Sequence, residues 1–423
     1  MLQRLSVLLV MAMWTATAMA GDFRAGAAMR IITPDPLLPV SGGMGEPHPV
    51  TAKTADLTTR VVVLEKDGVK AALVSVDSLG WPMVLGNRSR EKVKDIAPEN
   101  IIIASTHTHS APDAYGFPDM NGKNGADLKY LYWACDQIAD AINEASERLT
   151  PVHLKIGMGA AEGKIAYNYY APQLYDPRCG VIQGIYTTGD QAGKPLFTLV
   201  NYAIHPEVIG NNKGLLGPDL CGPLYDRIAE KGGGMAIFMN SAQGGMVTAD
   251  NRTPGGKDAE TWDECLRIGG LLADEALRIV ETASVQENPG LYCTARPISF
   301  PIDSLIMRTV IQMSPLGFTL GNDDPYVSRI NLLNIGTAQI LTIPGEALPN
   351  IGYYVKRHMP TNQPFLFGLA NDAIGYMLTK VDFRSFERYD YISETSLGEM
   401  TGEVYMNDAL KLVSESPKPD GQH

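Results

Sequence analysis

Two histidines follow a short apolar run whose residues favour a buried β-strand. The run Asn100–Ser105 reads Asn-Ile-Ile-Ile-Ala-Ser, and it leads directly into Ser105-Thr-His-Thr-His-Ser-Ala-Pro112. If the chain stays extended there, His107 and His109 point to the same side, because side chains alternate along a strand. Two imidazoles at a strand end can bind a metal together, or one can bind while the other transfers protons.

A third histidine stands in a similar setting. The segment Asn201-Tyr-Ala-Ile-His-Pro206 ends an apolar run, and Pro206 cannot extend a central strand, so His205 is expected where sheet gives way to loop. A single histidine at a strand end is more often structural, but three with a common placement favour a metal or catalytic site. The remaining histidines have no such setting and are expected at the surface or in packing: His48, His153, His358 and His423.

Three carboxylates are placed where they could join these histidines. Glu346 follows an apolar strand and a Pro-Gly turn, Asp77 follows the run Ala71–Val76, and Asp219 lies in a Gly-Pro-Asp loop. Ligands in α/β proteins gather at the carboxyl ends of strands. For Glu346 an equally good interpretation is a helix N-terminal carboxylate, stabilised by the helix dipole.

Hydrophobic periodicity predicts an α/β fold built on a mixed β-sheet core flanked by helices. Two hairpins are indicated, one turning at Lys66-Asp67-Gly68 and one around Gly189-Asp190. Apolar residues three or four apart predict amphipathic helices, with Gly269 on a buried helix face that makes a close contact. The expected strands are Arg60–Glu65, Lys70–Val76, Asn100–Ser105, Val181–Thr187, Pro195–Ile204, Met235–Met239 and Ala338–Ile343, and the expected helices are Asp127–Leu149 and Ala259–Val280.

Composition excludes several classes of protein. The 423 residues are 45% hydrophobic and 19% charged, which is typical of a globular chain and not of a disordered one. A net charge of −12 without a basic tract argues against a nucleic-acid partner. The five cysteines form no C-x-x-C pair, so a thiolate zinc site is not expected, although an oxidising compartment would allow up to two disulfides.

The two ends of the chain suggest export and a free tail. Residues 1–20 combine Arg4, an apolar run and Ala18-Met19-Ala20, which predicts a signal peptide cleaved before Gly21 and a secreted or periplasmic protein. The apolar run is too short for a membrane anchor, and we expect no transmembrane segment. We expect one catalytic domain over residues 21–413 and a disordered polar tail over residues 414–423.

Five motifs resemble the neutral/alkaline, non-lysosomal ceramidases and their bacterial relatives. They occur in the order of that family and span nearly the whole chain after residue 20. The pairing of Thr-His-Thr-His-Ser with His-Pro is the most specific element. The motifs are Phe23-Arg-Ala-Gly-Ala-Ala with Ile32-Thr-Pro34, Ser105–Pro112, Asn201–Pro206, Ile343-Pro-Gly-Glu-Ala347 and Asn371-Asp-Ala-Ile-Gly-Tyr376.

The resemblance implies a site and a reaction. It implies one Zn²⁺ per chain, with His109 as a catalytic histidine beside the metal. It also implies hydrolysis of the amide bond of ceramide or a related N-acyl lipid by water that the zinc activates. The ligands implied are His107, His205, Glu346 and Tyr376, and the implied substrate contacts are Gly43, Tyr169 and Thr248. The extra C-terminal domain of longer ceramidases is not expected. Transient contact with a membrane surface is compatible with such a substrate, and the oligomeric state is left open.

Two positions depart from the family pattern, and both concern the substrate. Tyr169 stands where the family often has an arginine, and Gly245 stands where it has an aspartate. Arg178 is a candidate for replacing the missing cationic contact. The metal ligands implied by the resemblance are all present.

Three alternatives remain open at the level of sequence. The protein could be a zinc amidase or esterase of the same fold with a substrate other than ceramide. A His-x-His motif also opens the binuclear metal site of amidohydrolase barrels. A non-catalytic lipid- or glycan-binding relative is the third alternative.

Overall fold

The largest sheet has nine strands. The structure, a computed structural model, describes residues 21–43, 46–119 and 121–421. Eight strands run in the order β13-β11-β10-β8-β1-β4-β5-β6, and β15 pairs with β8 beside this path. The strands are β1 (Arg24–Ile31), β4 (Thr58–Lys66), β5 (Val69–Val76), β6 (Ile101–Ser105), β8 (Thr150–Ala160), β10 (Arg178–Tyr186), β11 (Pro195–Tyr202), β13 (Met235–Asn240) and β15 (Val285–Gln286).

This sheet bends sharply between β8 and β1. The two strands pair only at Arg24↔Pro151 and Ala25↔Thr150, so they diverge beyond their first residues. The bend brings β13 back to the other half of the sheet, where the Ser75 hydroxyl donates to the Phe238 carbonyl over 2.6 Å. The two halves of the sheet therefore enclose a shared interior.

A four-stranded sheet in the order β16-β17-β18-β20 closes that interior. One core cluster contains Leu73 of β5, Ile237 of β13, Ile340 of β18 and Phe365 of β20, all buried. Residues one position along these strands face outward to the helices, as period-two alternation requires. The strands of this sheet are β16 (Leu291–Phe300), β17 (Tyr326–Ile335), β18 (Ala338–Thr342) and β20 (Pro364–Phe367).

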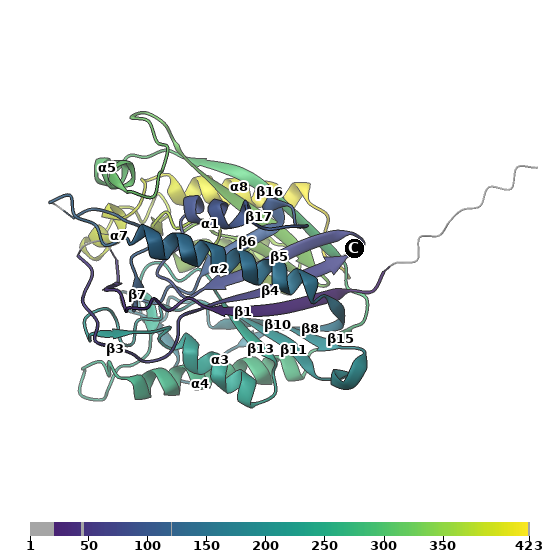
Figure 1. Ribbon diagram of the computed structural model, residues 1–423. Helices are drawn as coiled ribbons and strands as arrows, with labels where there is room; N and C mark the ends of the chain where they lie inside the picture. The colour runs from purple at the N-terminus through teal and green to yellow at the C-terminus, as the bar shows by residue number, and fades with distance from the viewer. Residues whose placement is uncertain (1–20, 44–45, 120, 422–423) are drawn as a thin grey trace, which may run out of the picture.

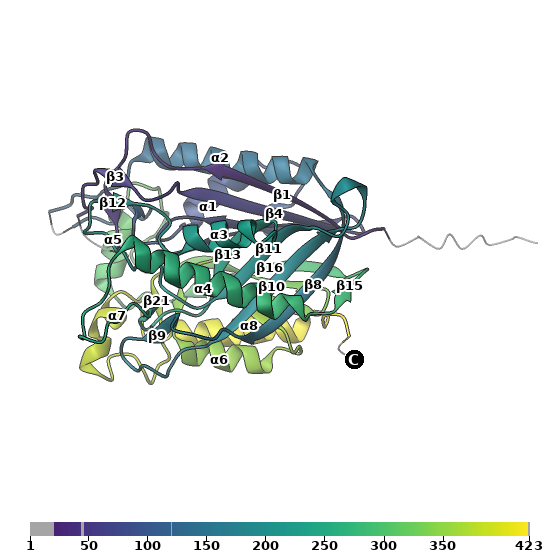
Figure 2. The same cartoon turned by 90° about the horizontal axis from the view of Figure 1, so that it is seen from below.

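Helices cover the outer faces of both sheets (Figures 1 and 2). α1 and α2 lie against β1, β4 and β5, whereas α3 and α4 cover β10, β11 and β13. α6 and α8 cover the outer face of the four-stranded sheet. The helices are α1 (Met83–Arg90), α2 (Leu128–Glu147), α3 (Cys221–Glu230), α4 (Trp262–Glu281), α5 (Leu305–Met313), α6 (Pro349–His358), α7 (Asp390–Glu394) and α8 (Thr401–Glu415).

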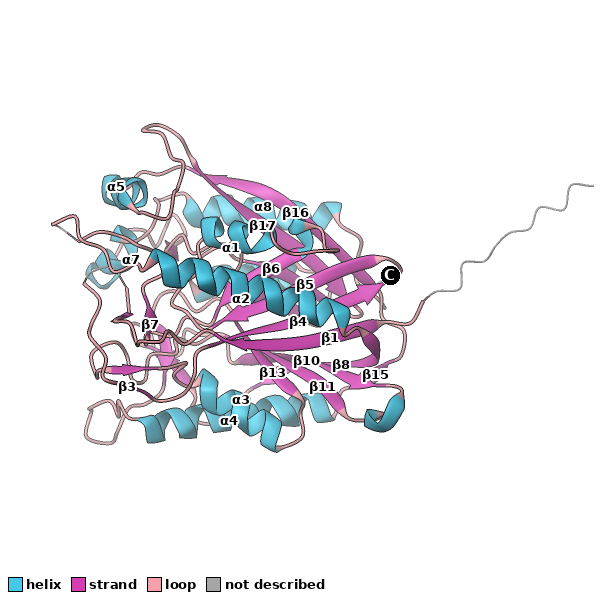
Figure 3. Cartoon of the chain, viewed as in Figure 1, coloured by secondary structure: helices cyan, strands magenta, loops and turns pink. Residues whose placement is uncertain are grey.

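The long loops gather at one end of the sheets, together with the short elements α5 and α7 (Figure 3). Several two- and three-residue strands tie these loops together in pairs. These are β2 (Val40–Ser41), β3 (Ala52–Lys53), β7 (Ala111–Pro112), β9 (Ala166–Asn168), β12 (Leu215–Leu216), β14 (Val247–Ala249), β19 (Glu346–Ala347) and β21 (Tyr376–Met377). Short 3-10 turns occur at Pro98–Asn100, Gly189–Gln191 and Glu387–Tyr389.

The predicted mixed sheet with flanking helices is confirmed, and so are both hairpins and both amphipathic helices. The open mixed sheet is not a (β/α)8 barrel, so the barrel alternative is wrong. All five cysteines are described and all are free thiols, four of them buried. Within the described residues, no helix is both long and apolar enough to cross a membrane. The predicted signal peptide over residues 1–20 and His423 lie outside the described residues.

The expectation of a disordered tail is wrong for residues 414–421. α8 continues to Glu415. Beyond it, the Asn334 side chain donates to the Pro417 carbonyl over 2.7 Å, and Asp420 accepts a hydrogen bond from the Gly290 amide over 2.7 Å. The polar residues of this segment form hydrogen bonds with the sheet and its turns. The prediction of disorder rested on the polarity of the segment, which does not distinguish such bonds from exposure to solvent.

Adjacent glycines in α4 allow a matched test of the helix contact. A Cβ at Gly269 would lie 2.3 Å from the carbonyl oxygen of Leu220, the residue before α3. A Cβ at Gly270 would meet no heavy atom of the described chain within 4 Å. We expect Gly269→Ala to lower the free energy of unfolding by about 1–3 kcal/mol. Gly270→Ala should raise it by up to about 1 kcal/mol, because alanine favours helix. Urea unfolding of both variants measures this, and equal effects would contradict it.

Candidate metal centre and active site

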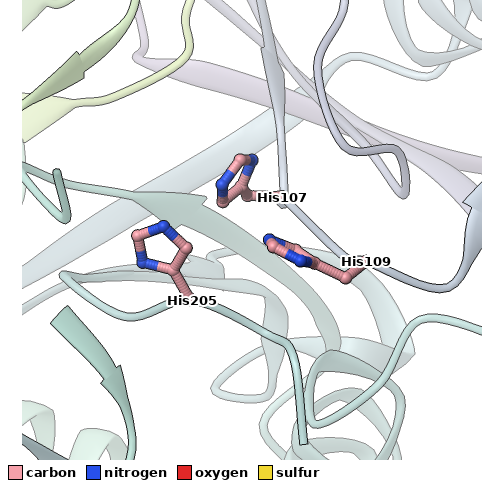
Figure 4. A group of neighbouring side chains, drawn as sticks. All are labelled: His107, His109 and His205. Carbon is pink, nitrogen blue, oxygen red and sulfur yellow. The ribbon is translucent and has the colours of Figure 1, made fainter. Parts of the chain in front are cut away.

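Three histidine rings from two separate loops face one small region (Figure 4). One ring nitrogen each from His107, His109 and His205 lies within 4.8 Å of the others. The ring centroids of His107 and His205 are 4.7 Å apart, and those of His107 and His109 are 4.9 Å apart. The sequence motifs that carry these histidines are therefore brought together as predicted.

The chain does not reach this arrangement by staying extended after Ser105. β6 ends there, and His107 has a φ of 73°, in the left-handed region that few non-glycine residues adopt. Its amide donates to the Ser78 carbonyl over 2.9 Å, which holds the turn. The expectation of an extended segment is wrong, and a strained turn directs the ring instead. Such strain is typical of functional sites.

Asn240, at the end of β13, joins the two loops that carry the histidines. Its side-chain nitrogen donates to the carbonyls of Thr106 and Ile204, over 3.1 and 2.7 Å. Its side-chain oxygen accepts from the Ile204 amide over 3.2 Å. Because Asn240 is fully buried, these bonds fix the backbone beside His107 and His205 without competition from water.

Backbone carbonyls determine which nitrogen of two rings carries the proton. His107 Nδ1 lies 2.6 Å from the Leu79 carbonyl, and His205 Nδ1 lies 2.7 Å from the Val247 carbonyl. A carbonyl only accepts hydrogen bonds, so both Nδ1 atoms must be protonated. In the neutral rings the Nε2 atoms then carry lone pairs, and both lie 3.2 Å from Glu346 Oε2.

Tyr376 is held beside Glu346 by strand pairing. The two residues are opposite each other in the parallel pair β19–β21, which places their side chains next to one another. Glu346 comes three residues before α6, and its carboxylate lies at the histidines, so the helix-dipole interpretation is not what the structure shows. The Tyr376 hydroxyl lies 3.7 Å from Met246 Sδ, and its ring lies in the same cavity as Glu346.

The buried charges of this cluster compensate one another. Burial alone would raise the pKa of Glu346, but His107 and His205 hold it well below its ordinary value. Burial lowers the pKa of His205, yet the hydrogen bond with Glu346 outweighs it and raises that pKa to about 8. Burial also lowers the pKa of His109 to about 3, so this ring is neutral.

The donor set fits a divalent metal ion. Two Nε2 lone pairs and a carboxylate oxygen are all acceptors, and acceptors converge on one point only when a proton or a cation lies between them. Imidazole and carboxylate are both zinc ligands. His109 adds a third ring, and its buried Nε2 has no hydrogen-bond partner among the described residues. These side chains can therefore hold a metal ion and leave one histidine free for proton transfer.

Two solved structures have the same fold as this chain. A neutral ceramidase from Pseudomonas aeruginosa matches with a TM-score of 0.75 and 18% sequence identity, over 94% of this chain and 76% of that chain. The chain has the fold of neutral ceramidase. A second structure, described as ceramidase complexed with C2, matches with a TM-score of 0.74, 18% identity and the same coverage. No protein-family model matches the sequence, and no curated protein sequence matches it.

On this neutral ceramidase fold, His107, His109 and Glu346 of the cluster line a mostly apolar cavity. Gly43, expected at the substrate, is part of its wall. The lining also draws on segments that the sequence analysis did not single out. Besides Gly42, Gly43, His107, His109, Glu346, Gly375 and Tyr376, the cavity is lined by Leu79, Tyr115, Phe117, Met307, Tyr391 and Thr395.

Two of the expected substrate contacts do not line this cavity. Tyr169 is 61% exposed, and the Thr248 side chain lies beside Glu207. Arg178 does not line the cavity either, because it forms an ion pair with Asp176 at 2.8 Å.

Asp77 and Asp219 bind neighbouring groups and are not among the clustered side chains. Asp77 accepts from the Thr58 amide and hydroxyl, and Asp219 accepts from the Ile209 and Leu220 amides. Both carboxylates therefore stabilise loops of the scaffold.

Metal retention should depend on His205. We expect the purified protein to hold about one metal ion per chain and His205→Ala to hold almost none, because one of three converging ligands is lost. Elemental mass spectrometry measures the content. His153→Ala is the control, since His153 belongs to β8 and not to the cluster. Wild-type metal content in His205→Ala would refute this assignment.

Metal affinity should also fall on acidification. In the metal-free protein the pKa of His205 is about 8, so below that pH a bound proton must leave before the metal can bind. The apparent affinity is then expected to fall about tenfold for each pH unit below about 8. Competition with a chelator between pH 6 and 9 tests this, and a pH-independent affinity would contradict it.

Proposed function

We propose that this protein is an exported zinc-dependent hydrolase that cleaves the amide bond of ceramide or a related N-acyl lipid. The products are a fatty acid and a free amine. The observation that carries the proposal is the convergence of His107, His205 and Glu346 beside an apolar cavity that His107 and Glu346 line, on the fold of neutral ceramidase. One catalytic domain over residues 21–413 is part of the proposal.

Zinc would be held by His107, His205 and Glu346, with Tyr376 as the fourth protein ligand. A zinc ion supplies a Lewis acid and lowers the pKa of a nearby water molecule to about 7. The protein orients this set through the Leu79 and Val247 carbonyls, which fix both histidine rings. Burial lets these interactions act without competition from bulk water.

His109 is the residue that we assign to proton transfer. Its neutral ring places Nε2 beside the rings of His107 and His205, and that nitrogen has no other partner in the described chain. His109 can therefore accept a proton from the attacking water and return it to the nitrogen of the departing amine. General base and acid catalysis of this kind contributes about 10²–10⁴-fold.

The cavity favours a neutral substrate with an apolar chain. Its wall presents Leu79, Phe117 and Met307, and no lysine or arginine of the described residues lines it. An apolar wall stabilises a hydrocarbon chain by removing it from water. A carboxylate or phosphate beside the amide would find no cation there. Gly43 contacts the substrate in this proposal, and the roles expected of Tyr169 and Thr248 would need the substrate to extend beyond the cavity.

Export and brief contact with a lipid surface complete the proposal. Residues 1–20 have the pattern of a signal peptide, which would place the mature protein in the periplasm or outside the cell. Leu305 and Ile306 of α5 are 77% and 57% exposed, next to Met307 in the cavity wall. Apolar side chains there would ease transfer of a lipid from a membrane into the cavity.

Release of fatty acid from N-acyl lipids tests the function. We expect the zinc-loaded protein to hydrolyse short- or long-chain ceramides dispersed in detergent, with both products quantified by mass spectrometry. His109→Gln should lower kcat by at least about 10²-fold and keep its zinc, because proton transfer is lost and the ligands are not. His153→Gln, which changes a histidine outside the cluster, should be fully active.

The outcomes separate this proposal from its alternatives. Cleavage of acyl esters without cleavage of amides would indicate an esterase of the same fold. Tight lipid binding without any turnover by the zinc-loaded protein would indicate a binding protein. Either result would overturn the proposed amidase.

A further inference from the structure

We propose that Glu207 positions His109, by accepting a hydrogen bond from its Nδ1–H and so keeping the lone pair of Nε2 directed at the metal centre. This inference rests on the proposed function, because it concerns the histidine assigned to proton transfer. Glu207 itself touches neither the metal ligands' Nε2 atoms nor the cavity wall, and it acts through His109.

The contact is formed by the backbone of two neighbouring loops. The His109 amide donates to the Pro206 carbonyl over 3.1 Å, which brings the two loops together next to Glu207. The Glu207 amide donates to the His205 carbonyl over 3.0 Å. Glu207 Oε2 then lies 3.5 Å from His109 Nδ1. Distances of this kind are often long without substrate and shorten in the reacting complex.

Thr248 holds the carboxylate from the other side. Its side chain lies beside Glu207 and lowers the pKa of that carboxyl, and its backbone forms a parallel bridge with His205. The sequence Thr248–Glu207–His109 is therefore a chain of polar side chains that ends at the unpartnered Nε2. The chain gives Thr248 a role that does not require substrate contact.

The arrangement determines the tautomer of His109. A neutral imidazole has one N–H and one lone pair, and a carboxylate beside Nδ1 favours the proton there. Without Glu207, the proton could move to Nε2, where it would point at the other two rings. The His109 ring could then neither take a proton from water nor keep a fixed orientation. In His107 and His205, a backbone carbonyl beside Nδ1 fixes the tautomer. In His109, the group beside Nδ1 is the carboxylate of Glu207.

Nitrogen NMR of protein labelled at histidine tests the tautomer directly and needs no substrate. In the wild-type protein we expect His109 Nδ1 to be protonated and Nε2 to be unprotonated, with the signals assigned by their loss in His109→Gln. In Glu207→Met, which has similar volume and no acceptor, the proton should shift to Nε2 in a measurable fraction of molecules. A wild-type His109 that carries its proton on Nε2 would overturn the proposal.

Kinetics supply the second readout. Glu207→Met should lower kcat by about tenfold to a hundredfold, with KM within twofold of wild type and zinc content unchanged. Thr248→Val should give a smaller loss in the same direction. Glu144→Met is the matched control, because Glu144 is a similarly shielded carboxylate on α2 that forms ion pairs with Arg30 and Arg148. It should leave both the NMR signals and kcat unchanged.

Failure of this inference differs from failure of the proposed function. If the wild-type protein cleaves N-acyl lipids and Glu207→Met retains full kcat, Glu207 has no positioning role and the amidase assignment stands. If no N-acyl lipid is cleaved, the amidase assignment fails, and the NMR result still decides whether Glu207 orients His109. Loss of zinc from Glu207→Met would also overturn the inference, because the carboxylate would then support the metal and not the ring.

Discussion

The site depends on one electrostatic constraint: acceptor atoms from three distant segments converge on the same point. The Nε2 atoms of His107 and His205 both lie 3.2 Å from Glu346 Oε2. Such an arrangement is unfavourable unless a positive charge lies within it. The hydrogen bond between His205 and Glu346 supplies that charge when His205 is protonated, and a cation could take the place of the proton. In either case the surrounding fold must hold the three groups in place. It does so with hydrogen bonds from the two histidine rings to the Leu79 carbonyl, in the loop after β5, and to the Val247 carbonyl in β14.

The three side chains themselves follow the ends of regular strands. β6 and β11 end just before their histidines, and β18 ends four residues before Glu346. Each of these strands has a parallel neighbour, namely β5, β13 and β20. Loops that leave parallel strands emerge at one edge, where ligand sites form in α/β proteins. Asn240 then joins two of these loops through buried hydrogen bonds. The site is rigid because regular sheet continues almost to each functional side chain.

The sequence was informative where chemistry and local pattern coincide. Apolar runs followed by a polar side chain pointed to His107, His205 and Glu346, and the resemblance to ceramidases added Tyr376, which pairs with Glu346 across β19 and β21. Periodicity does not describe the left-handed turn at His107, because that turn depends on a bond to the distant Ser78. The cavity could not be predicted from the sequence either, because its wall combines side chains from segments far apart in the chain.

Glu207 shows how a signal in the sequence can be overlooked. It stands two residues after His205, where an extended chain would place both side chains on one face. The sequence does not indicate which group this carboxylate faces. That depends on the hydrogen bond from the His109 amide to the Pro206 carbonyl, which brings the two loops together. In the proposed enzyme, the same loop would supply a metal ligand through His205 and an orienting carboxylate through Glu207. Metal binding and proton transfer would then share one backbone segment, so any change that displaces this loop would affect both functions at once.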